Sequence, residues 1–126
     1  MLTWLLIGTL VYVVTFFVPS LFLVGALGVG KYLGSRDEEP EASPVHGRAK
    51  RANRNFNENY PVFMGLGILA LVVAEADVAM ATTGAMIFVI ARVLYLPLYM
   101  AAVPVVRSLV YIAGLVGLIM MGLALI

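Results

Sequence analysis

The chain has no cysteine, few charged residues and a single histidine. Without cysteine, disulfides, thiolate-bound metals and a cysteine nucleophile are all excluded. Charged residues make up 12% of the 126 positions and hydrophobic residues 63%, whereas a soluble domain carries about 25% charged residues. So little polar surface cannot cover a water-soluble globule of this size, and the composition indicates an integral membrane protein. The formal net charge of +1 gives no indication of nucleic-acid binding, and we expect neither nucleic acid nor a metal as partner.

Four apolar segments are long enough to cross a membrane, which takes about 20 residues as a helix. They predict an all-α fold, a single integral membrane domain over 1–126 that forms a four-helix bundle of up-down topology. The helices are expected over about 2–33, 44–74, 78–102 and 104–126. No charge precedes Lys31, so the first segment fits a membrane helix better than a signal peptide, which needs a basic start.

A polar loop over 34–47 separates the first two helices. It is acidic and contains proline, so we expect it to be solvated. Ser43 and Pro44 suit the N-cap and the first position of the second helix. His46 is expected to be solvated as well, with tuning of a nearby site as the less favoured alternative.

Basic residues are distributed unevenly between the connections. Lysine and arginine near the ends of membrane spans favour the cytoplasmic side. The short second turn holds Glu75 and Asp77 and no basic residue, whereas six basic residues surround the first loop: Lys31, Arg36, Arg48, Lys50, Arg51 and Arg54. The first loop is therefore predicted to be cytoplasmic, and both termini to lie on the opposite side.

The second helix carries a set of polar residues into the membrane. Arg51, Asn55 and Glu58 recur at i, i+4 and i+7, on one helical face, and Arg48 and Arg54 flank that face. Glu58 lies about 15 Å along the helix from Arg48, below the interface, where an isolated carboxylate is costly. We therefore expect Glu58 to point into the bundle, toward arginine.

The third helix presents a second polar face. Arg92, Tyr95 and Tyr99 occur at i, i+3 and i+7, and the depth of Arg92 matches that of Glu58. One interpretation is a buried Glu58–Arg92 pair that only joins two helices, because buried pairs are often structural. The two tyrosines on the same face favour the other interpretation, the wall of a binding site.

Arg107 lies in the first turn of the fourth helix, where the helix dipole is positive, so a cation there favours an anionic neighbour. An alternative is an arginine that reaches the lipid headgroups. Arg48, Arg51, Arg54, Arg92 and Arg107 all project toward the cytoplasmic half, and Glu58 cannot neutralise all five. This excess of positive charge predicts a site between helices that binds an anion together with an amphipathic or hydrophobic molecule.

These motifs resemble a known family. Arg51-x-x-x-Asn55-x-x-Glu58-x-x-Pro61, Arg92-x-x-Tyr95-x-x-x-Tyr99 and Arg107-Ser108 resemble the MAPEG family, the membrane-associated proteins in eicosanoid and glutathione metabolism, in particular the bacterial type of microsomal glutathione transferase. The resemblance covers nearly the whole chain. It implies a homotrimer in the membrane lipid, with glutathione as co-substrate between neighbouring subunits near the cytoplasmic face.

The resemblance also implies roles for individual residues. Arg51, Asn55 and Glu58 hold glutathione, which has two carboxylates and one ammonium group. The third helix completes the pocket with Arg92, Tyr95 and Tyr99, and Arg48 and Arg54 are grouped with these binding residues. Arg107 is the catalytic residue: it stabilises the thiolate, which attacks a lipophilic electrophile or reduces a lipid hydroperoxide.

Two alternatives remain. A non-catalytic MAPEG member that binds lipid or acts as a membrane scaffold would share the four spans. A small multidrug exporter also has four spans, but it needs an acid within the membrane for proton coupling. Glu58 is the one candidate here, and arginines surround it, so this alternative is disfavoured.

Overall fold

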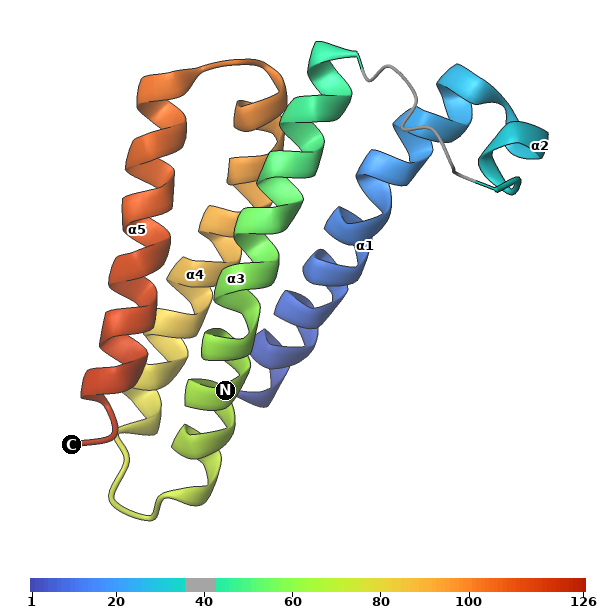
Figure 1. Ribbon diagram of the computed structural model, residues 1–126. Helices are drawn as coiled ribbons and strands as arrows, with labels where there is room; N and C mark the ends of the chain where they lie inside the picture. Colours follow the sequence, from blue (N-terminus) through green and yellow to red (C-terminus); the bar gives the residue numbers. More distant parts are fainter. Residues whose placement is uncertain (36–42) are drawn as a thin grey trace.

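Four long helices make up the computed structural model, which describes residues 1–35 and 43–126. The elements in chain order are α1 (Leu2–Leu27), the four-residue α2 (Val29–Tyr32), α3 (Pro44–Val72), α4 (Val78–Met100) and α5 (Pro104–Leu123). The long helices alternate in direction. Both termini and the α3–α4 turn lie toward one end, and the α4–α5 connection and the start of α3 lie at the other (Figure 1). The predicted all-α, up-down arrangement is confirmed.

The predicted first helix is interrupted at Gly28. Gly28 has a φ of 77°, in the left-handed region that a residue with a Cβ rarely adopts. Its N–H donates to the Val24 carbonyl, so α1 ends at Leu27 and α2 begins as a separate turn. The prediction of one helix over 2–33 is therefore wrong at its end. The other three long helices stop two or three residues earlier than predicted.

The predicted cap at Ser43 is confirmed. The Ser43 Oγ accepts a hydrogen bond of 3.2 Å from the His46 N–H, and Pro44 occupies the first turn of α3. Residues 44–47 are consequently helical, although they were also assigned to the polar loop, and the His46 ring is half-buried rather than solvated. Residues 36–42 of that predicted loop, Arg36 among them, lie outside the described residues.

The chain is a multi-pass integral membrane protein. Three helices, α1, α4 and α5, are long and apolar enough to cross a membrane. The fourth, α3, is 29 residues long, but its N-terminal half is polar, so it falls outside this class on composition. Large apolar side chains remain exposed along α1, α4 and α5, as expected for surfaces that face lipid.

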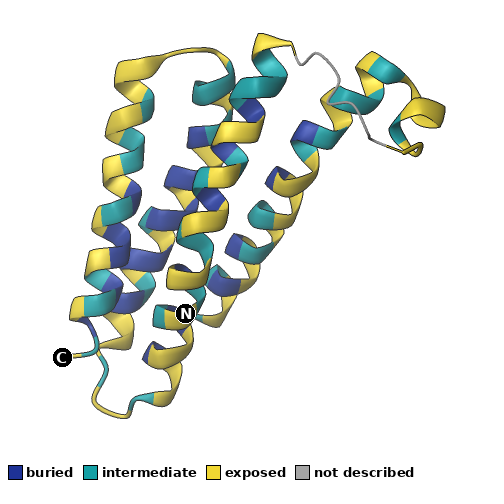
Figure 2. Cartoon of the chain, viewed as in Figure 1, coloured by how far each residue is buried: buried dark blue, intermediate teal, exposed yellow. Residues whose placement is uncertain are grey.

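Small residues let the helices approach closely, as in other membrane bundles. The Phe63 ring lies over Gly8, and Leu5 lies over Gly67, which joins α1 to α3. Phe63 also stacks on Phe88 of α4, with ring centroids 4.7 Å apart. Buried residues lie on the sides of the helices that face one another (Figure 2). Helix α1 packs on α3 and α4, and its backbone does not come close to that of α5.

Candidate functional site

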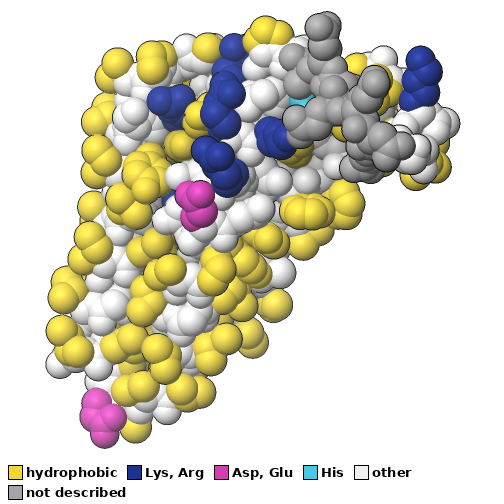
Figure 3. All heavy atoms as spheres, in the orientation of Figure 1, with side chains coloured by type: hydrophobic (Ala, Val, Ile, Leu, Met, Phe, Trp, Pro, Cys, Tyr) yellow, Lys and Arg dark blue, Asp and Glu magenta, His cyan; other side chains and the backbone are white. Residues whose placement is uncertain are grey.

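Basic side chains gather at one end of the molecule, where α3 begins and α4 connects to α5. Figure 3 shows the Lys and Arg side chains at this end, above a surface that is otherwise mainly hydrophobic. Helix α3 supplies Arg48, Arg51 and Arg54, and the first turns of α5 supply Arg107. The sequence-based prediction that these arginines share one end is borne out by the fold.

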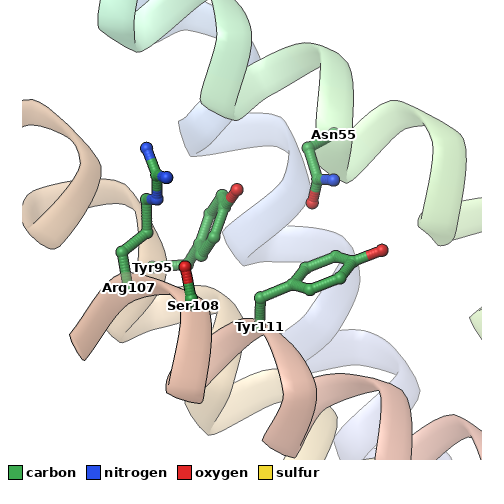
Figure 4. Close-up of a pocket in the computed structure, with 5 residues that line it drawn as sticks. All are labelled: Asn55, Tyr95, Arg107, Ser108 and Tyr111. Carbon is green, nitrogen blue, oxygen red and sulfur yellow. The ribbon is translucent and has the colours of Figure 1, made fainter. Parts of the chain in front are cut away.

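A cavity of about 170 Å³ opens between α3, α4 and α5 at this end. It is lined by one residue from α3, one from α4 and three from α5: Asn55, Tyr95, Arg107, Ser108 and Tyr111 (Figure 4). None of these five residues is acidic, and all five bear polar groups. The lining therefore suits the binding of an anionic or hydrogen-bonding group.

Arg107 is held against an aromatic ring of α4. Its guanidinium carbon lies 4.4 Å from the centroid of the Tyr99 ring, and the Arg51 guanidinium lies 5.9 Å from the same centroid. Tyr99 in turn packs edge-to-face on Tyr95, with centroids 5.5 Å apart. Cation–π attraction of this kind orients a guanidinium without neutralising it, so two cations lie near one ring with their charge available to a ligand.

Arg92 lies behind the cavity, not in its lining. Its side chain is buried, and its Nη1 donates a hydrogen bond of 2.7 Å to the Oδ1 of Asn55. The prediction that Arg92 projects inward at the level of the α3 polar residues is confirmed. Its partner is Asn55, however, so the alternative interpretation of a buried Glu58–Arg92 pair is wrong.

Glu58 does not point into the bundle as expected, but lies at the surface. Its side chain is 63% exposed, and its Oε1 lies 3.9 Å from the Nε of Arg54, itself 75% exposed. The reason is helix geometry: Phe56 lies on the buried face of α3, and two further residues rotate a side chain by about 200°. Glu58 and Arg54 are therefore exposed on the surface of the single chain and do not enter the packed interior.

Arg48 joins α3 to the end of α4. Its Nε donates a hydrogen bond of 2.9 Å to the carbonyl of Met100, the last residue of α4. The last carbonyls of a helix lack an internal donor, and a cation near them also complements the helix dipole. One nitrogen of Arg48 thus has a structural role.

We expect Arg48→Ala to lower the free energy of unfolding by about 1 kcal/mol, because a half-buried, charge-assisted hydrogen bond is lost. Arg54→Ala is the matched control, since an exposed ion pair contributes about 0.5 kcal/mol or less. Thermal unfolding in detergent compares the two variants. Equal midpoints for both variants would contradict the structural role of Arg48.

Ser108 and Tyr111 line the cavity but were not among the predicted site residues. Ser108 donates from its Oγ to the Pro104 carbonyl at 2.9 Å, which leaves its oxygen as an acceptor. Tyr111 follows Arg107 by four residues and so shares its helical face. This spacing was available in the sequence, but a tyrosine in an apolar helix is indistinguishable there from an interfacial aromatic.

The fold and the site define a class: a multi-pass helical membrane protein with a polar cavity at the arginine-rich end of its bundle. The MAPEG family model matches residues 1–126, and the chain belongs to the MAPEG family. That family consists largely of glutathione-dependent enzymes and typically forms trimers. Comparison with curated proteins and with solved structures gives no match.

Proposed function

We propose that the protein is a glutathione-dependent membrane transferase or peroxidase that acts on lipophilic electrophiles or lipid hydroperoxides. The observation that carries this proposal is the position of Arg107, which lines a polar cavity without acidic lining residues and is braced by the Tyr99 ring. Family membership supports the choice of glutathione as the thiol.

The charges at this end of the bundle match those of glutathione. Arg51 and the amide of Asn55 suit its carboxylates, and the exposed Glu58 suits its ammonium group. Tyr95 and Tyr99 would wall the site, with Arg48 and Arg54 at its rim. A cavity of about 170 Å³ is too small for the whole tripeptide, so we assign the cavity to the thiol end and the α3 surface to the remainder.

Arg107 would favour the thiolate form of the bound thiol, because a neighbouring guanidinium stabilises the anion. In conjugation, the thiolate forms a carbon–sulfur bond and the leaving group departs with its electron pair. In peroxide reduction, the thiolate attacks the O–O bond and releases an alkoxide, which takes up a proton. A second glutathione then converts the sulfenic product to the disulfide and water.

A homotrimer with glutathione between subunits accounts for the exposed residues of α3. Arg54 and Glu58 are exposed on the single chain, where a neighbouring subunit would cover them. The excess of lysine and arginine around the first loop favours a cytoplasmic position for this end, with both termini on the other side.

An assay of the purified protein tests the proposal. Glutathione is supplied with an aryl halide or, separately, with an organic hydroperoxide, and conjugate or disulfide formation is followed. We expect turnover with at least one of the two acceptors that saturates with glutathione. Absence of both reactions, together with absence of glutathione binding, would favour a non-catalytic MAPEG protein that binds lipid or acts as a scaffold.

A further inference from the structure

Arg92 is surrounded by aromatic rings. Its side chain is 2% exposed, and its guanidinium carbon lies between 4.9 and 5.7 Å from four ring centroids. We call these four rings the Arg92 cage: Phe56, Phe88, Tyr95 and Tyr111. Among the described residues, the one hydrogen-bond partner of its guanidinium is the Asn55 Oδ1, since Nε and Nη2 have none.

A buried guanidinium without a carboxylate is costly unless other groups compensate. The ring faces of the Arg92 cage provide cation–π attraction, which is stronger in a desolvated site than at a surface. An apolar side chain would fill the same space without this cost. An apolar residue at position 92 would, however, lack the hydrogen bond to Asn55.

This contact determines how the Asn55 amide is turned. A guanidinium has donors and no acceptor, so the amide atom that faces it must be the oxygen. A flipped amide would place its NH₂ group against the cation. Asn55 therefore keeps its Nδ2 as the group left to donate, and Figure 4 shows the amide oxygen and nitrogen pointing in different directions above Tyr111.

We propose that Arg92 is a positioning residue: it does not touch the ligand, but it fixes the Asn55 amide so that Nδ2 donates to a carboxylate of the ligand. This inference rests on the proposed function, in which that ligand is glutathione. Tyr95 and Tyr111 take part in both the Arg92 cage and the cavity lining, so the cage also ties Arg92 to the walls of the site.

A double-mutant cycle on glutathione affinity tests the positioning role. Calorimetric titrations compare the unmodified protein with Arg92→Met, Asn55→Ala and the double variant. We expect each single variant to weaken binding about tenfold or more, and the double variant to match Asn55→Ala. The proposal is overturned if Arg92→Met weakens binding by the same factor in the Asn55→Ala variant as in the unmodified protein, because Arg92 then does not act through Asn55.

Asn55→Asp keeps the test decisive if Arg92→Met fails to fold. An aspartate retains and strengthens the contact with Arg92 but has no donor for a ligand carboxylate. We expect this variant to fold and to lose glutathione affinity about tenfold or more. Unchanged affinity would overturn the proposal.

The orientation can also be measured without glutathione. In protein labelled with ¹⁵N-asparagine, the side-chain NH₂ signals of Asn55 are assigned by their absence in Asn55→Ala. Arg92→Lys, which keeps the charge but lacks the planar fork, should broaden or shift these signals. Signals unchanged in Arg92→Lys and in Arg92→Met would overturn the positioning role. Failure of the unmodified protein to bind glutathione would instead overturn the proposed function.

Discussion

Replacement of Arg107 by alanine is expected to lower kcat by about 100- to 1,000-fold, the effect typical of losing one preorganised charge at a reacting anion. The guanidinium lies 4.4 Å from the Tyr99 ring centroid and lines the cavity, and no acidic residue of the lining offsets its charge. Steady-state rates of glutathione conjugation at saturating glutathione measure the effect.

Two comparisons make this result specific to Arg107. Arg107 is half-buried and its guanidinium packs on the Tyr99 ring of the same chain, so the variant should elute from a sizing column like the unmodified protein. Arg107→Lys retains the charge but not the planar stacking, and we expect it to recover part of the rate. Unchanged kcat in Arg107→Ala would remove Arg107 from the catalytic step.

Replacement of Gly117 by alanine is expected to lower the free energy of unfolding by about 3 kcal/mol, the upper end of the effect of overpacking. A Cβ at position 117 would lie 2.6 Å from the Gly84 carbonyl oxygen and 2.9 Å from the Phe88 nitrogen. Both contacts are with backbone atoms, which cannot rotate away, so α5 would have to move from α4. Thermal unfolding in detergent measures the loss.

The matched control is Gly122→Ala on the same helix, where an added Cβ meets no atom within 4 Å. Because alanine favours helix over glycine by up to about 1 kcal/mol, we expect this variant to be neutral or slightly stabilised. Gly117→Ala should also reduce turnover, since α5 carries Arg107 and Tyr111 against α4. Equal stability of the two variants would mean that the α4–α5 contact is looser than described.

Local signals in the sequence were sufficient to predict the helices and their caps. The length of the apolar segments predicted four long helices, and Ser43 followed by Pro44 marked the start of α3 correctly. The interruption at Gly28 was missed, because glycine in an apolar run is also common within membrane helices. Only the backbone geometry distinguishes the two cases.

The direction of individual polar side chains was harder to predict. A helical wheel places Asn55 and Glu58 near one another, but it does not show which side of α3 faces α4. The buried alanines and phenylalanines of α3, among them Ala52 and Phe56, decide that side, and they leave Glu58 exposed. The expectation that Glu58 points into the bundle was therefore wrong, and so was the alternative of a Glu58–Arg92 pair, although Arg92 does lie at the depth of the α3 polar residues.

The Arg92 cage was not predictable from motif spacing. Phe56 and Phe88 contribute two of its rings, and in the sequence both read as ordinary core residues of apolar helices. Their proximity to Arg92 arises from tertiary packing, with guanidinium-to-centroid distances of 5.6 and 4.9 Å. Only the three-dimensional structure shows which of the core aromatic residues surround Arg92.

Calorimetric titration of glutathione into the detergent-purified protein tests the central claim most directly. We predict saturable binding that weakens about tenfold or more in Glu58→Ala, because the partner of the glutathione ammonium is lost. Glu75→Ala, which removes an exposed carboxylate from the opposite end, should bind like the unmodified protein. Absence of binding by the unmodified protein, or equal loss in both variants, would contradict a glutathione site at the basic end of the bundle.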